Sequence, residues 1–254
     1  MGTTDDRGGA RGDADDLDPA TGDDPGRRRM VEHDLVGRGI TDPAVLDAMR
    51  SVPRHRFVGA GQAAAAYDDR PLPIGDGQTI SQPYVVALTA ESLALRPTDR
   101  VLDVGTGSGY AAAVLGTIAA EVWSIERHRG LAERAAATLA DLGYSNVHVV
   151  TGDGTAGLVA HAPFDAIAVA AASKTIPTAL TDQLAEGGRL VIPVGPSRGT
   201  QRLVLVRRDG DALVERHITD VRFVPLVEGP ATSRDEADAG EQRPDGVGEP
   251  RRPE

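Results

Sequence analysis

The sequence has 254 residues, 40% of them hydrophobic but only 3% aromatic, and a formal net charge of -11. This length suits one α/β domain with tails, whose core must be filled mainly by alanine, valine and leucine. The negative charge repels phosphate backbones and so opposes nucleic-acid binding. The absence of cysteine excludes disulfides and thiolate ligands, and no histidine pair has metal-ligand spacing, so we expect no metal.

No apolar run reaches the ~18 residues of a membrane span, and the acidic, glycine-rich N-terminus is unlike a signal peptide. We therefore expect a soluble cytoplasmic protein that is monomeric and does not bind membranes. Residues 1–29 and 228–254 are polar and contain few apolar side chains. We predict that both are disordered tails, because no core contact offsets the entropy of ordering them.

The first part of the predicted domain, 30–98, combines helices with a long loop. Apolar residues from Met30 onward recur at helical spacing, and Thr41 or Asp42 before Pro43 indicates the start of a helix that ends at Ser51-Val52-Pro53. Residues 67–83 contain three prolines and two glycines, which predicts an ordered but irregular loop. A further helix is expected over 84–95.

The second part, 99–227, alternates strands and helices. We predict strands at 101–104, 121–126, 147–150, 164–171 and 189–194, with helices at 111–120, 130–142 and 177–184 between them. This alternation predicts a mostly parallel, doubly wound α/β sheet covered on both faces. Strands at 203–208 and 222–226 have no helix between them, which suggests an antiparallel edge.

A glycine turn follows the first of these strands, in the segment V-L-D-V-G-T-G-S-G-Y from Val101 to Tyr110. Glycines let the backbone approach a bound ligand closely and let the next helix sit against the sheet. The G-x-G-x-G spacing differs from the dinucleotide pattern G-x-G-x-x-G, which disfavours an NAD dehydrogenase. It resembles motif I of the S-adenosylmethionine-dependent methyltransferases, which implies their Rossmann-like fold.

Polar residues also follow the next two predicted strands. Glu126 ends one strand and could accept two hydrogen bonds from a ribose diol. Asp153 and Gly154 follow the next, where a polar group could meet the adenine amine. Asp103 could orient the glycine turn or face an ammonium group. Ligands of doubly wound sheets bind beyond the carboxyl ends of the strands, so these residues should meet at one site.

Several further segments together resemble the protein-L-isoaspartate (D-aspartate) O-methyltransferase family over about 30–227. They are R-H-R-F-V at 54–58, D-R-P-L-P-I-G at 69–75, Q-T-I-S-Q-P at 78–83, D-A-I at 165–167, G-G-R-L-V-I-P-V-G at 187–195 and R-F-V-P-L at 222–226. The basic cluster at 54–57 would, taken alone, fit a solvated helix end equally well. Asp76 departs from the family pattern, because bacterial relatives often carry histidine between the two glycines.

The resemblance implies both the reaction and the site. The family methylates the free carboxylate of L-isoaspartyl and D-aspartyl residues in damaged proteins and peptides, which starts repair through a succinimide. Its cofactor is S-adenosyl-L-methionine, and S-adenosyl-L-homocysteine is the product. Ser81 matches the active-site serine and Val194 a position that pairs with the substrate backbone. The implied cofactor residues are Thr79, Ile80, Asp103, Gly105, Thr106, Gly107, Ser108, Gly109, Glu126, Arg127, Asp153 and Gly154.

Two other enzymatic interpretations stay open from the sequence. Relatives of this family methylate an ordinary aspartate of a ribosomally made peptide and so install an aspartimide. An RNA methyltransferase would share the glycine turn, but the net charge and the segment around Ser81 oppose it. The chemistry itself requires no general base, since a carboxylate with a reference pKa near ~4 is already ionised at neutral pH.

Overall fold

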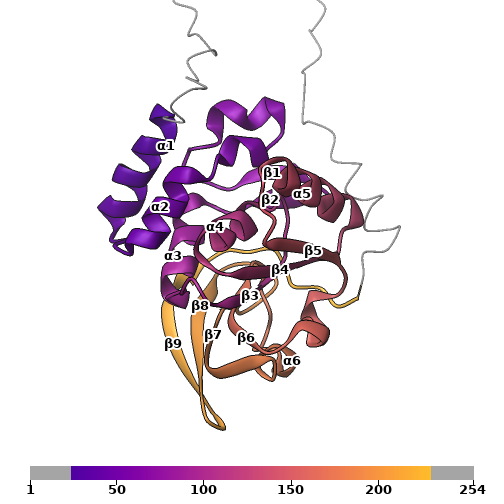
Figure 1. Cartoon of the computed structure of the whole chain (residues 1–254). Helices are drawn as coiled ribbons and strands as arrows, with labels where there is room; N and C mark the ends of the chain where they lie inside the picture. The colour runs from indigo at the N-terminus through magenta and orange to yellow at the C-terminus, as the bar shows by residue number, and fades with distance from the viewer. Residues whose placement is uncertain (1–23, 230–254) are drawn as a thin grey trace, which may run out of the picture.

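A seven-stranded sheet forms the centre of the protein in a computed structural model that describes residues 24–229 (Figure 1). The strands are β3 (Arg100–Val104), β4 (Glu121–Glu126), β5 (Val147–Thr151), β6 (Phe164–Val169), β7 (Leu184–Val194), β8 (Gln201–Asp209) and β9 (Ala212–Val221). Their spatial order is β5-β4-β3-β6-β7-β8-β9. The first five are parallel, and β8 and β9 are antiparallel. The predicted mostly parallel sheet with an antiparallel edge is confirmed.

The central strands are apolar because both of their faces are buried. In β3, Val101 packs into a core on one face, whereas Leu102 and Val104 pack into a second core on the other. Ala166 and Ile167 divide between the same two cores in β6. This alternation follows from the two-residue period of a strand.

Helices of different length cover the two faces (Figure 1). The helices after the N-terminal segment are α3 (Pro83–Leu93), α4 (Tyr110–Ile118), α5 (Arg129–Asp141) and α6 (Thr178–Thr181). The first core takes most of its helical side chains from α3 and α4. The second core receives Leu180 of the short α6. Within the described range no helix is long and apolar enough to cross a membrane.

The N-terminal segment packs against α3 and α4. It contains α1 (Pro25–Arg29), a π-helical turn at Met30–Leu35, a 3₁₀ turn at Val36–Arg38 and α2 (Pro43–Ser51). Asp42 caps α2 by accepting from the Ala44 amide at 2.8 Å, as predicted. Asp24 caps α1 in the same way, so the predicted tail boundary at residue 29 lies too far along the chain. The other predicted tail residues, 1–23 and 230–254, lie outside the described range.

The segment predicted as an irregular loop contains a small β-hairpin. Strands β1 (Leu72–Gly75) and β2 (Gln78–Ile80) pair antiparallel. Gly75, Asp76 and Gly77 all have positive φ at the turn, and the Asp76 carboxylate accepts from Arg134 at 3.0 Å. The prediction of no regular structure at 67–83 was therefore wrong for the hairpin. The flanking prolines concealed strands of only three or four residues.

The expectation for the end of the domain also needs correction. The second antiparallel strand is Ala212–Val221, and 222–226 is no strand of the sheet. β9 was missed because it is an edge strand whose side chains are exposed on both faces, which leaves little hydrophobic alternation. Residues 222–229, here called the strap, instead run past the carboxyl ends of β6 and β5, where they form hydrogen bonds with Ala172 and Asp153. The Ala172 amide donates to Val224 and the Leu226 amide to the Ala172 carbonyl, each at 2.8 Å.

Candidate active site

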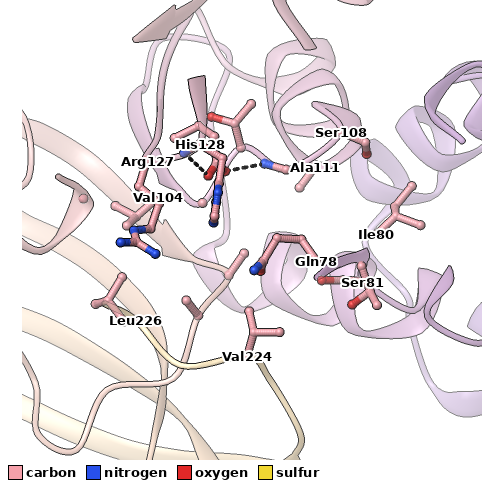
Figure 2. Close-up of a pocket in the computed structure, with 18 of the residues that line it drawn as sticks. Gln78, Ile80, Ser81, Val104, Ser108, Ala111, Arg127, His128, Val224 and Leu226 are labelled. Atoms are coloured by element: carbon pink, nitrogen blue, oxygen red, sulfur yellow. Dashed lines mark hydrogen bonds between the residues drawn. The ribbon is translucent and has the colours of Figure 1, made fainter. Parts of the chain in front are cut away.

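A pocket lies beyond the carboxyl ends of the central strands, where the chain order diverges from β3 toward β4 and toward β6. Figure 2 shows Ile80 and Ser81 on the side of the pocket away from Arg127 and Leu226. The predicted residues that line it are Thr79, Ile80, Ser81, Gly105, Thr106, Gly107, Ser108, Glu126, Arg127 and Gly154. The structure therefore brings together most of the residues that the sequence indicated.

At the glycine turn, backbone atoms without a side chain border the pocket. Gly105 and Gly107 have φ values of +96° and +54°, which disfavour other residues. A Cβ on Gly107 would lie 3.2 Å from Ile74 Cδ1 in the hairpin. Gly109 is not on the lining: a Cβ there would meet α5, 3.2 Å from Leu139 Cδ1. Gly109 therefore permits helix packing, while the other two glycines border the pocket.

Glu126 is held in place by backbone amides. Its Oε2 accepts from the Gly107 amide at 2.9 Å and its Oε1 from the His128 amide at 3.0 Å. The residue is 6% exposed. Each carboxylate oxygen has a second lone pair, so both can accept one further hydrogen bond. This leaves an anchored acceptor pair for a diol.

Asp103 lies next to the main pocket and does not line it. It borders a smaller adjoining cavity that Ser81 also lines. Its Oδ2 accepts from Ser124 Oγ at 2.6 Å, and Thr106 Oγ1 lies 2.6 Å from the same hydroxyl. Burial and, to a smaller extent, the Glu126 charge raise the pKa of Asp103 to about 7 against the lowering effect of the Ser124 hydrogen bond. Its Oδ1 is buried and has no hydrogen-bond partner in the described part of the chain.

Asp153 is turned toward the protein although Gly154 lines the pocket. Its Oδ1 accepts from the Thr155 amide and hydroxyl at 2.8 and 2.7 Å, and its Oδ2 from the Gly229 amide at 2.7 Å. Burial opposes ionisation, but these hydrogen bonds hold the pKa of Asp153 below its ordinary value. The carboxylate thus connects the end of β5 to the strap. A contact of Asp153 with adenine stays a prediction.

Val194 lies at the end of β7 and outside the pocket lining. It pairs with Arg202 on β8 and forms an isolated bridge with Ser173. Its role in substrate pairing stays a prediction. Sequence reasoning missed some lining residues, namely Gln78, Val86, Val104, Tyr110, Ala111, Ile125, His128, Ala170, Ala171, Val224, Pro225, Leu226 and Val227. The last four belong to the strap. Val224, Pro225 and Leu226 were missed because 222–226 was predicted to be a strand of the sheet.

These features fit S-adenosyl-L-methionine. Glu126 offers acceptors for ribose hydroxyls, the glycine turn leaves room for the polar tail, and Asp103 carries an unpartnered buried oxygen beside the pocket. Within residues 24–229 no group of three or more histidine or carboxylate side chains is placed to hold a metal ion. The sheet and the pocket define an S-adenosyl-L-methionine-dependent methyltransferase of the Rossmann-like class.

More specifically, the chain belongs to the protein-L-isoaspartate(D-aspartate) O-methyltransferase family, whose model matches residues 27–231. It is 58% identical over 205 residues to protein-L-isoaspartate O-methyltransferase of Roseiflexus sp. (strain RS-1), covering 81% of this chain and 93% of that one. Identity to the protein of the same name from Methylorubrum extorquens (strain PA1) is also 58%, over 207 residues, 82% of this chain and 90% of the other. The predicted family is confirmed.

Solved structures agree with this assignment. A protein-L-isoaspartate O-methyltransferase superposes with a TM-score of 0.72 at 31% identity, over 78% of this chain and 65% of that longer chain. A Plasmodium falciparum structure titled as a protein-L-isoaspartate O-methyltransferase, in complex with S-adenosyl-L-homocysteine, gives a TM-score of 0.69 at 28% identity. That superposition covers 79% of this chain and 98% of the other. The fold thus agrees with structures that carry the family's name.

Proposed function

We propose that this protein transfers a methyl group from S-adenosyl-L-methionine to the free carboxylate of L-isoaspartyl and D-aspartyl residues in damaged proteins and peptides. The observation that carries the proposal is that one pocket joins Ser81 with the glycine turn and Glu126. The cofactor supplies an already activated methyl group. The protein therefore has to bind, orient and desolvate the substrate carboxylate.

Each part of the pocket has a role in this proposal. Glu126 would hold the ribose, and the turn from Gly105 would border the tail of the cofactor. The Ser81 hydroxyl would donate to one oxygen of the substrate carboxylate and so aim the other at the cofactor. Ile80 and Leu226 contribute apolar walls that exclude water, which matters because a hydrated carboxylate is a poor nucleophile.

No protein group needs to remove a proton from the substrate. An isoaspartyl carboxylate is ionised at neutral pH, and ester formation releases no proton. The backbone amide nitrogen that follows then attacks the methyl ester without the enzyme and expels methanol. The resulting succinimide is opened by water, in part to normal aspartate. The protein would thus act only on the first step of repair.

A matched pair of peptides tests the proposal. One carries an isoaspartyl residue and the other the same sequence with a normal aspartyl residue, and methyl transfer from labelled cofactor is measured for both. We expect strong preference for the isoaspartyl peptide. Ser81→Ala should lower kcat/KM about tenfold or more, because a hydrogen bond to a charged group is lost, while S-adenosyl-L-homocysteine binds as before.

Ser51→Ala is the matched control for this substitution, since Ser51 ends α2 and lies outside the pocket lining. It should leave transfer unchanged. Equal methylation of both peptides would overturn repair specificity and favour aspartimide formation on ordinary aspartate. Transfer to neither peptide would overturn the proposed substrate altogether.

We further propose that the protein acts as a monomer in the cytoplasm. The large hydrophobic side chains exposed within the described range are Val36, Val159, Leu213, Val214 and Val227, which are spread over several elements. Such scattered residues do not make the contiguous apolar patch of a stable interface. Light scattering on the purified protein and localisation of a tagged copy test the two statements.

A further inference from the structure

Arg54 is a buried cation that the proposed reaction has not yet used. It begins the 3₁₀ turn Arg54–Phe57 and is 0% exposed, whereas Arg56 in the same turn is exposed. Burial lowers the pKa of the Arg54 guanidinium, but an arginine remains charged inside proteins. The basic cluster at 54–57 is therefore not simply a solvated helix end.

The guanidinium of Arg54 contacts the backbone of the loop that carries Ser81. Its Nη2 donates to the Ser81 carbonyl at 2.7 Å, and its Nε donates to the Ala66 carbonyl at 2.7 Å. Its Cζ lies 4.7 Å from the centre of the Tyr110 ring, which lines the pocket. Arg54 thus reaches the proposed active site through the backbone of the residue that would hold the substrate.

No carboxylate forms an ion pair with Arg54 in the described part of the chain. Its Nη1 is buried and has no hydrogen-bond partner there. Tyr110 and, less strongly, Asp69 raise the pKa of Arg54. Tyr110 is a neutral phenol, and the Asp69 oxygens accept from Arg38, Gln82 and the Tyr84 amide at 2.6 to 2.9 Å. A positive charge without a contacting counter-ion in the described residues therefore touches the backbone carbonyl of Ser81.

Asp69 completes a clamp around the same loop. It holds the Gln82 side chain and the Tyr84 amide, while Arg54 holds the Ser81 carbonyl. Two charged groups thus hold this loop, and Arg54 is the one that contacts Ser81 itself. If bracing of the loop were the sole requirement, a neutral donor would cost less, because burying an unpaired charge is expensive.

We propose that Arg54 is a positioning residue for carboxylate methylation, and that its buried charge draws the anionic substrate group to the hydroxyl of the Ser81 it holds. This inference rests on the proposed function. An isoaspartyl carboxylate bound at Ser81 would be the missing counter-ion of Arg54, acting across the Ser81 backbone. A neutral group at the same place would gain nothing from this charge.

The test compares an isoaspartyl peptide with the same peptide in which the free carboxylate is a carboxamide. The KM of the first and the inhibition constant of the second are measured for the wild type, Arg54→Met and Arg54→Lys. In Arg54→Met we expect the KM of the isoaspartyl peptide to rise about tenfold or more. The inhibition constant of the carboxamide peptide should rise less than about threefold. Arg54→Lys should restore part of the preference for the charged peptide.

Arg208→Met is the matched control. Arg208 also donates through Nη2 to a backbone carbonyl at 2.7 Å, on Thr181, and also has a buried guanidinium nitrogen without a partner. It does not line the active-site pocket. We expect this variant to keep the wild-type discrimination between the two peptides, even where its thermal stability falls.

The possible outcomes separate the inference from the proposed function. One outcome is that the wild type methylates the isoaspartyl peptide while Arg54→Met weakens the binding of both peptides equally. In that case Arg54 only braces the structure and the inference is overturned. If the wild type does not methylate the peptide, the proposed function fails first. Should Arg54→Met not fold, the neutral donor variant Arg54→Gln decides: it must lose affinity for the charged peptide more than for the carboxamide, with S-adenosyl-L-homocysteine binding retained, or the inference fails.

Discussion

The two sides of the pocket are built in different ways. The side proposed for the cofactor is formed at the ends of three adjacent strands, where Glu126 is the last residue of β4 and Gly107 and Gly154 lie in the turns after β3 and β5. The side proposed for the substrate is formed by Ser81, which Arg54 holds from 27 positions away, and the strap from the far end of the domain closes the pocket between the two sides. One side is local in sequence, and the other depends on long-range contacts.

This difference separates the binding of the cofactor from the selection of the peptide substrate. Adjacent parallel strands place their carboxyl ends at one edge of the sheet, so a nucleoside site results whenever the strand-end residues are suitable. The substrate side has no such rule, because the Ser81 loop is positioned by side chains that donate to or accept from its backbone. We therefore expect substitutions on the first side to affect cofactor binding, and those on the second to affect the peptide.

The largest effect is expected for stability at Asp103, the buried carboxylate of the cofactor side. Its folded pKa of about 7 lies above its unfolded value of 3.8, so the folded state binds more protons between these values. Its contribution to stability is present at low pH and is lost as the pH rises through 7. The wild type should lose up to about 4 kcal/mol more than Asp103→Asn between about pH 4 and pH 7.5.

Urea denaturation of both proteins at the two pH values measures this difference. The asparagine keeps an oxygen that can accept from Ser124 Oγ, so the packing of the network is retained. Identical pH dependence of the two proteins would show that Asp103 does not titrate as its burial implies.

A second effect, of about 2.7 kcal/mol, is expected on cofactor affinity for Glu126→Ala. The Kd of S-adenosyl-L-homocysteine should rise about 100-fold, because two charge-assisted hydrogen bonds to the ribose are lost. Titration calorimetry measures the Kd, with Glu126→Gln as the isosteric control of intermediate effect. An unchanged Kd in the alanine variant would refute the division between the two sides of the pocket.

The smallest effect, about 1 kcal/mol, is expected for Asp153→Ala, which loosens the strap that joins the two sides. The variant loses the cap of the turn Gly154–Ala156 and the acceptor for the Gly229 amide. Hydrogen exchange of residues 224–229 should quicken, and the Kd of S-adenosyl-L-homocysteine should rise roughly fivefold. Asp153→Asn keeps only one acceptor oxygen, so it can retain either the contacts of Thr155 or the contact of Gly229, and we expect an intermediate effect. Slow exchange in both variants would mean that other contacts hold the strap.

The match between prediction and structure follows the same division. The strand over 121–126 was predicted with the observed bounds, and Glu126 lies where the strand-end argument placed it. The hairpin at Leu72–Ile80 and the edge strand β9 were missed because short or exposed strands show little hydrophobic alternation. Arg54 was left between two interpretations, since a sequence does not show which member of a basic cluster is buried.

The sequence by itself determined the fold class, the family and the place of the glycine turn and Glu126 at the strand ends. Hydrophobic periodicity and a glycine turn are local signals, and parallel strands bring their ends together without further information. Only the tertiary structure decided that Arg54 is buried behind Ser81, that Asp153 holds the strap and that residues 224–227 line the pocket. These features are contacts between segments distant in the chain, and they exist only once the core has packed and fixed both partners.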